Sequence, residues 1–410
     1  MDIIQIEMFP AKKGDVFLLR FDNKNNILID MGYRDTYTNY IRDRLIQIKN
    51  EGQCIDLLVI THIDQDHIEG AIEFFKENGN CNNSKIVEVK EIWHNSYRHL
   101  QFDKEKRDKI SNFETHRLEE IILANSNRRE NTTNESKQIK AKHGSTLAGY
   151  LYGFDYEKRW NTKFNHKAVN LDNRREIEFD YIKIYMLSPN TDNLKRLSNK
   201  WLKELRKFDF DFNISDEKIF DDAYEMYLKK IKPLMDVNDE EKVSYRKVNF
   251  KTVIDNLIES TDNSTSESNE SSIAFIIEYK NVKVLFLGDA DESIILNGLN
   301  KYNNLGNELD FDVIKLSHHG SIRNNYNLID IIKAKRYLIS TNGKSYGHPD
   351  ENVIAKIIMH NKEHKELYFN YPIKMLEEIN DIQLREKYNY SINIGDGESS
   401  MIVGVKEKNE

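Results

Sequence analysis

The sequence predicts an α+β fold in which helices cover β-sheets and two charged, mostly helical segments interrupt the strands. The first observation is a hairpin pattern followed by a strand–helix–strand alternation within residues 2–60, which favours layered sheets and helices over a pure barrel or bundle. The second is a charged helical pattern that fills two long stretches of the chain. The third is a set of strand patterns that returns after Ser272.

The N-terminal part of the chain contains the first strand patterns. A turn at Gly14-Asp15 and a polar stretch at residues 23–26 separate three apolar runs. Apolar positions at helical spacing then predict a helix over residues 38–49. The elements we expect here are strands over 3–8, 16–21, 27–30, 55–60 and 86–94 and helices over 38–49 and 71–78.

The remaining patterns divide the chain into a core and two insertions. We expect the first half of the core at 1–98, a helical insertion at 99–175, a core strand within 176–190, a second helical insertion with a polar linker at 191–270, and the second half of the core at 271–410. Residues 126–134 and 260–270 have the most polar, loop-like composition. The later elements we expect are strands over 177–187, 273–279, 282–287, 311–316, 336–340, 366–370 and 391–405 and a helix over 350–360.

The composition indicates a soluble protein of a reducing compartment. The chain has 410 residues, of which 39% are hydrophobic, so it can bury a sizeable core. A net charge of −8 from 60 basic and 68 acidic residues argues against nonspecific coating of DNA, although it allows a local basic groove. Cys54 and Cys81 lack a paired metal-binding spacing. Without a signal pattern or a run of roughly 18 apolar residues, we expect a cytoplasmic location and no membrane partner.

Residues 61–70 concentrate metal-binding side chains directly after the strand over 55–60. His62, Asp64, Asp66 and His67 stand within six residues. Their spacing does not fit one face of a strand or helix, so it predicts a loop that wraps a cation. Neutral imidazole and carboxylate groups bind zinc and harder cations such as manganese. The alternative interpretation is a solvated acidic loop.

Two later strands also end in potential metal ligands. Asp289 follows the strand over 282–287, and His318 and His319 follow the strand over 311–316. Loops at the ends of strands can bring side chains from distant parts of the sequence to one centre. We therefore expect three such loops to build one site.

The pattern His62-x-Asp64-x-Asp66-His67 resembles the signature of the metallo-β-lactamase fold superfamily, whose commonest form has histidine at the position of Asp64. The aspartate variant resembles the hydrolase domain of the ComEC-type competence proteins and its stand-alone soluble relatives. The resemblance covers about residues 3–95, 176–190 and 270–360 and does not extend to the insertions. The other matching motifs are Lys13-Gly14-Asp15, Ile29-Asp30-Met31-Gly32, Ser271-Ser272, Leu287-Gly288-Asp289, Ser317-His318-His319-Gly320-Ser321 and Tyr346-Gly347-His348-Pro349.

The resemblance implies an αββα sandwich with a binuclear metal site at one edge. One of the two adjacent histidines would complete metal two, and we favour His319 as the ligand and His318 near the substrate. The superfamily usually supplies a further metal-one histidine after the strand that ends here at Ser188-Pro189, where none stands. Metal one would then be weakly held, or completed by water or by a residue such as His94. The implied assignment is His62 and Asp64 to metal one, Asp66 and His67 to metal two, and Asp289 to both.

Two divalent cations, zinc or manganese, would lower the pKa of a shared water and neutralise charge on a phosphoryl or carbonyl oxygen. Asp66 would orient that water in addition to binding metal. His348 would donate a proton to the leaving group or contact a phosphate. The alternative is that His348 is only a structural residue of a capped turn. Asp30 would anchor the loops of the site by hydrogen bonding. His94 fits a packed residue at the end of a strand better than a ligand.

We therefore expect a phosphodiesterase or nuclease that acts on nucleic acid or a nucleotide-derived molecule. The basic and aromatic residues of the insertions would form a groove for a phosphate backbone or, as we favour, the solvated face of a cap. The alternative function is a partner-binding or sensing subunit of a multi-protein system, with the insertions as the interface and a structural or auxiliary metal site. These basic and aromatic residues are Lys104-Glu105-Lys106-Arg107, Arg128-Arg129, Lys158-Arg159-Trp160, Lys195-Arg196 and Lys200-Trp201.

Overall fold

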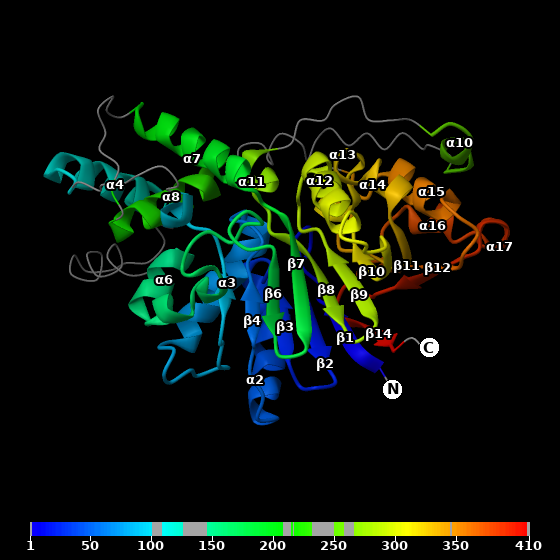
Figure 1. Cartoon of the computed structure of the whole chain (residues 1–410), viewed down its shortest axis with the longest axis horizontal. Helices are drawn as coiled ribbons and strands as arrows, with labels where there is room; N and C mark the ends of the chain where they lie inside the picture. The colour runs from blue at the N-terminus through cyan, green and yellow to red at the C-terminus, as the bar shows by residue number, and fades with distance from the viewer. Residues whose placement is uncertain are drawn as a thin grey trace.

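Two β-sheets pack face to face, and helices cover the outer face of each, so the expected αββα sandwich is present (Figure 1). The computed structural model describes residues 2–100, 109–125, 146–207, 215, 217–231, 250–257, 266–344 and 347–407. The polar stretch 126–134, the basic runs 104–107 and 128–129, and Tyr346 lie outside the described residues.

The first sheet has six strands in the order β14-β1-β2-β3-β4-β5. The strands from β14 to β3 pair antiparallel, and β3, β4 and β5 pair parallel. The C-terminal strand β14 thus pairs with the N-terminal strand β1. The bounds are β1 Asp2–Met8, β2 Phe17–Phe21, β3 Asn26–Ile29, β4 Leu57–Val59, β5 Ile92–Trp93 and β14 Met401–Lys406.

The second sheet has eight strands in the order β13-β12-β11-β10-β9-β8-β7-β6. The strands from β6 to β9 pair antiparallel, and those from β9 to β13 pair parallel. The bounds are β6 Glu176–Phe179, β7 Ile182–Ser188, β8 Ala274–Tyr279, β9 Val282–Phe286, β10 Asp310–Lys315, β11 Lys333–Ile339, β12 Lys365–Phe369 and β13 Tyr390–Ile394.

Apolar side chains on both faces of the strands build three hydrophobic cores, one between the sheets and one under each helix layer. In β7, for example, Ile184 and Met186 point into the core between the sheets, while Tyr185 and Leu187 face the helices. Successive side chains of a strand point to opposite faces, so a strand covered on both faces is apolar at nearly every position. This explains the continuous apolar runs in the sequence.

Each sheet has its own helix layer. The helices of the first sheet are α1 Arg34–Thr36, the π-helix η1 Tyr37–Ile41, α2 Arg42–Asn50 and α3 Gln65–Asn78. Those of the second sheet are α12 Glu292–Asn303, α13 Ile322–Asn325, α14 Leu328–Ile331, α15 Glu351–Met359, α16 Leu376–Ile379 and α17 Ile382–Tyr388, with α10 Phe250–Asp255 packed on α15. Within the described residues, no helix is both long and apolar enough to cross a membrane.

The two insertions, which are separate in the sequence, pack against one another beside α3 (Figure 1). Helix α8 contacts both α4 and α6. Trp160 and Trp201, which the less favoured groove interpretation offered for base stacking, are only 2% and 1% exposed and belong to the core under the helices. The helices are α4 Asn112–Asn125, α6 Leu147–Gly153, α7 Thr191–Leu205, α8 Lys218–Ile231 and α11 Glu267–Glu270, and the short 3-10 segments are η2 Tyr97–Leu100, η3 Tyr156–Arg159 and η4 Thr162–Phe164.

Several expected boundaries were wrong. The strand over 86–94 is only β5, with one isolated bridge between Ile55 and Val89. The strand over 177–187 is a hairpin of β6 and β7, because Asp180 adopts a left-handed backbone with φ +50° and turns the chain. The segment over 391–405 divides into β13 and β14, which join different sheets. Residues 267–270, expected as unstructured, form α11, whose first turn the Ser266 side chain caps.

Candidate metal centre

Three strand ends meet at one edge of the sandwich, as the sequence predicted. The segment after β4 carries His62 and Asp64, the turn after β9 carries Asp289, and the turn after β10 carries His318 and His319. The amide of Ile273 donates a hydrogen bond of 2.9 Å to the carbonyl of Thr61, and this bond joins the two sheets at the same edge. The site therefore takes side chains from both sheets.

The predicted loop over residues 61–70 is partly helical. Helix α3 begins at Gln65, not at residue 71, so Asp66 and His67 lie in its first turn. The carbonyl of Asp64, in extended conformation, accepts the amides of His67 and Ile68 and so starts the helix. Extended chain carries His62 and Asp64, and the first turn of the helix carries Asp66 and His67. Because the backbone changes from extended to helical between the two pairs, the four side chains can reach the metal centre from different directions.

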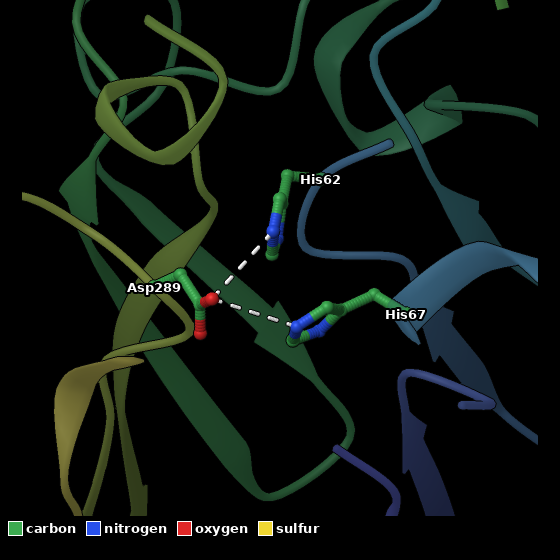
Figure 2. Close-up of side chains that lie close together, drawn as sticks. All are labelled: His62, His67 and Asp289. Carbon is green, nitrogen blue, oxygen red and sulfur yellow. Dashed lines mark ion pairs between the residues drawn. The ribbon is translucent and has the colours of Figure 1, made fainter. Parts of the chain in front are cut away.

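Asp289 points toward His62 and His67 (Figure 2). Its Oδ2 atom is 3.8 Å from His62 Nε2 and 3.6 Å from His67 Nε2. The Nε2 atoms of His318 and His319 are each 3.9 Å from the same oxygen. Four imidazoles thus face one oxygen of Asp289, a residue that is only 2% exposed.

Hydrogen bonds from the protein orient His67 toward Asp289. Its Nδ1 donates to Asp30 Oδ2 at 2.8 Å, and Asp30 also accepts the amide of Thr61 at 2.8 Å and its hydroxyl at 2.7 Å. Burial alone would lower the pKa of His67, but the charges of Asp30 and Asp289 raise it well above its usual value. A cation that binds His67 Nε2 therefore has to displace a proton. This arrangement agrees with the anchoring role expected for Asp30.

His62 and Asp64 form a second pair at the centre. His62 Nε2 is 3.0 Å from Asp64 Oδ2, and the hydroxyl of Ser268 donates to Asp64 Oδ1 at 2.8 Å. The other ring nitrogen of His62 lies 3.0 Å from Thr61 Oγ1 and 3.4 Å from Ser272 Oγ. Ser268 belongs to α11, so the end of the second insertion contacts the expected metal-one ligand directly.

The donor atoms fit a divalent cation. The Nε2 atoms of His62 and His67 are buried and form no hydrogen bond within the described residues, since the 3.0 Å contact of His62 Nε2 with Asp64 Oδ2 is close enough for an ion pair but lacks hydrogen-bond geometry. Such buried nitrogens are costly unless they bind something else. Three ligand groups among the described residues have donor atoms that all lie within 4.8 Å of one another: His62 with His67 and Asp289, Asp66 with His67 and His319, and Asp15 with Asp30 and His67. The second group is the set expected for metal two. Burial lowers the pKa of His319, which keeps its imidazole neutral and able to bind metal.

His318 and His348 lie together at the outer side of the centre. Both residues of the pair His318-His319 adopt left-handed backbones, with φ of 42° and 56°, and the His318 side chain is 24% exposed. The rings of His318 and His348 have their centroids 5.2 Å apart. Asp350 Oδ2 is 3.3 Å from His348 Nδ1, and Asn324 Oδ1 is 3.3 Å from His318 Nδ1.

His94 lies away from the metal ligands. Its Nε2 is 2.9 Å from Glu225 Oε1 of α8, and its ring stacks on Trp160. No ligand group found in the described part of the chain includes His94. At the position of the missing superfamily histidine, Ser188 is fully buried. The structure thus places His94 as a packed residue at the end of a strand.

The sequence interpretation missed several residues that touch the site. In the sequence, Asp15 stands out only as part of the motif Lys13-Gly14-Asp15, and Lys315 only as part of a strand, although a lysine within an apolar run is itself a signal. Ser268 carried no signal, because only the fold brings it to Asp64 across 204 positions of sequence.

A model of the family described as "Metallo-beta-lactamase superfamily" matches residues 10–155. This part of the chain, less than half of its length, is therefore similar to the metallo-beta-lactamase superfamily. The matched range holds Asp30, His62, Asp64, Asp66 and His67. The later residues of the site lie beyond the match.

The crystal structure of the metallo-beta-lactamase fold protein YhfI from Bacillus subtilis aligns with 98% of this chain and 99% of that chain, at 9% identity and a TM-score of 0.37. Because both values are low, this likeness supports no inference about function. No curated protein matches the chain.

Proposed function

We propose that the chain is a metal-dependent phosphodiesterase or nuclease of the ComEC-like type. The observation that carries the proposal is the convergence of four imidazoles on Asp289 Oδ2, two of them with buried Nε2 atoms that form no hydrogen bond within the described residues. Such a set of nitrogen and oxygen donors is suited to divalent cations.

Asp66, His67 and His319 would hold one cation, His62 and Asp64 would hold the other, and Asp289 would contact both. When bound, the cations would supply an activated water and positive charge opposite the phosphoryl group. Zinc and manganese both suit this mixed shell, because Asp64 stands where the superfamily usually has a softer histidine ligand. The aspartate also favours phosphodiester over lactam chemistry in this resemblance.

The protein's own groups would carry the protons. Asp66 is within reach of His67 and His319, so its carboxylate can orient the attacking water. His318, partly exposed and 3.9 Å from Asp289, would contact the phosphate. His348, beside His318 and paired with Asp350, would donate a proton to the leaving oxygen.

The test is a hydrolysis screen of the purified full chain. Single-stranded DNA, duplex DNA, RNA and cyclic dinucleotides are incubated with zinc or with manganese, and bound metal is measured by elemental analysis. We expect Asp289→Ala to lower the rate about 100-fold or more, the scale of losing one group that stabilises transition-state charge, and to lower metal content. The matched control is Asp396→Ala, which removes an exposed carboxylate far along the sequence from the centre.

Two results would contradict the proposal. One is activity and metal content that both survive Asp289→Ala. The other is a metal-loaded chain that cleaves none of the four substrates, which would favour a partner-binding role with an auxiliary metal site.

A further inference from the structure

Lys315 is a buried cation at the edge of the candidate metal centre. It is the last residue of β10, and its side chain is 1% exposed. Its ammonium group pairs closely with Asp15 and donates a hydrogen bond of 2.9 Å to the carbonyl of Gly288. A lysine is rarely buried this completely without a specific partner. The question is why a positive charge stands where cations are expected to bind.

The two oxygens of Asp289 have different neighbours. The four histidine contacts described above all reach Oδ2, at 3.6 to 3.9 Å. The charged group next to Oδ1 is Lys315, whose Nζ is 3.8 Å away. The carboxylate is therefore divided, with one oxygen toward the imidazoles and the other toward a fixed ammonium group.

Lys315 also holds the backbone that carries Asp289. Gly288 has a left-handed backbone with φ +51°, and its carbonyl accepts hydrogen bonds from Lys315 Nζ at 2.9 Å and from the amide of His318 at 3.1 Å. The amide of Asp289 in turn donates to Ser272 Oγ at 3.1 Å. The lysine thus acts on Asp289 both through the preceding carbonyl and through Oδ1.

Asp15 balances the charge of Lys315. It is 2% exposed at the side chain, and its Oδ1 is 3.6 Å from His319 Nδ1. Because Asp15 neutralises the ammonium group, Lys315 can lie near the metal centre without repelling a bound cation as strongly as an unpaired positive charge would. His319 Nδ1 donates to the Ser340 carbonyl at 2.8 Å, so His319 keeps its own orientation without Asp15.

We propose that Lys315 is a positioning residue that keeps Oδ1 of Asp289 away from the cations, so that Asp289 binds metal through Oδ2 alone. This inference rests on the metal centre of the proposed function. The competing explanation is that Lys315 and Asp15 form a buried ion pair that only stabilises the fold.

The test uses cobalt(II) in place of the native metal, because the position and intensity of its visible absorption bands report the number of ligand atoms. In Lys315→Met, Oδ1 is free to turn toward the cation, and we expect weaker bands, as a higher coordination number gives. The variant also leaves Asp15 buried without its cation, so its melting temperature should fall. The double variant Asp15→Asn/Lys315→Met removes both charges, and its melting temperature should recover toward that of the wild type while the altered spectrum remains.

The matched control is Lys365→Met. Lys365 is also fully buried, in β12, but its ammonium group donates only to the carbonyls of Ile358, Asn361 and Glu363 among the described residues. Its loss should lower the melting temperature and leave the cobalt spectrum unchanged.

The outcomes separate the two explanations. A wild-type cobalt spectrum in Lys315→Met, or in the double variant if the single variant does not fold, would overturn the positioning role and leave the metal centre intact. Wild-type protein that binds no cobalt would contradict the metal centre itself, and the inference with it.

Discussion

At the scale of single residues, the carboxylate of Asp30 orients the buried imidazole of His67 for binding a cation. Asp30 accepts three hydrogen bonds, from the amide and hydroxyl of Thr61 and from His67 Nδ1. Because Nδ1 keeps its proton in the bond to Asp30, Nε2, which faces Asp289, is the nitrogen that gives up its proton to a cation. Asp30 can reach these groups because it adopts a left-handed backbone, with φ +55°, which aspartate tolerates better than most residues. Such an outlier at the end of β3 agrees with a functional constraint.

We expect Asp30→Asn to weaken metal binding about 10- to 100-fold, the usual effect of losing the partner of a metal-binding histidine. The new amide has a single acceptor oxygen, so it cannot accept both the Thr61 amide, now at Oδ1, and the His67 Nδ1 proton, now at Oδ2. If the amide oxygen keeps the Thr61 amide, the NH₂ group faces His67 Nδ1 and favours the other tautomer. His67 would then keep its proton on Nε2, the atom that binds metal. Calorimetric titration with zinc or manganese measures the effect.

The control for this variant is Asp56→Asn in the same sheet. Asp56 is also largely buried and also accepts a backbone amide, from Asn26 at 2.9 Å, but it contacts none of the candidate ligands in the described structure. It should lower stability without changing metal affinity. Equal metal affinity in Asp30→Asn and wild type would show that Asp30 only braces the loop.

At the scale of elements, helix α8 holds the two insertions and the core together through buried carboxylates. Asp221 accepts the amide of Arg98 at 2.7 Å and the hydroxyl of Tyr152 at 2.5 Å. Asp222 accepts the hydroxyl of Thr146, and Glu225 accepts the amide of Ala148 at 3.1 Å. The partners come from the end of the first core segment and from the first insertion. The second insertion is therefore docked by charge and hydrogen bonds as well as by apolar contact.

We expect Asp222→Asn to remove a pH dependence of stability. Burial, the largest cause, raises the pKa of Asp222 from 3.8 to about 7. Between these values the folded chain keeps a proton that the unfolded chain has lost, so the free energy of unfolding falls as pH rises. The full effect above pH 7 is at most about 4 kcal/mol, from about 1.4 kcal/mol per pKa unit.

Urea denaturation between pH 4.5 and 7.5 measures this effect. The asparagine variant should lose less stability than the wild type over that range, and Asp192→Asn, at an exposed position of α7, should follow the wild type. Parallel curves for wild type and Asp222→Asn would mean that Asp222 titrates alike in the folded and unfolded chains.

The burial of the carboxylates of helix α8 could not be predicted from the sequence. The residue types at the ends of β4, β9 and β10 predicted which side chains meet, because a metal-ligand residue directly after an apolar strand is a local signal. The carboxylates of α8 are buried, although the sequence predicts them on a solvated surface, because a charged helical pattern is typical of such a surface. Their burial depends on partners such as Arg98, which is 123 positions away from Asp221. Local pattern cannot report contacts of that range.

At the scale of the whole molecule, the candidate centre joins the two sheets at one edge. His62 and His67 follow β4 of the six-stranded sheet, and Asp289 and His319 follow β9 and β10 of the eight-stranded sheet. A bound cation would thus cross-link the two halves of the sandwich. Without a cation, the buried imidazoles and carboxylates of this edge balance their charges against one another and against Lys315 within the described structure.

We therefore expect a chelator to lower the melting temperature of the wild-type chain. A ligand that binds only the folded state at 100 times its dissociation constant adds about 2.7 kcal/mol to the free energy of unfolding. Zinc or manganese added back should restore the loss, as measured by calorimetry. In Asp289→Ala, which removes the carboxylate shared by both expected metals, the chelator should change little. A chelator effect of equal size in both proteins would place the stabilising cation elsewhere, because Asp289 is the carboxylate that both expected cations would share.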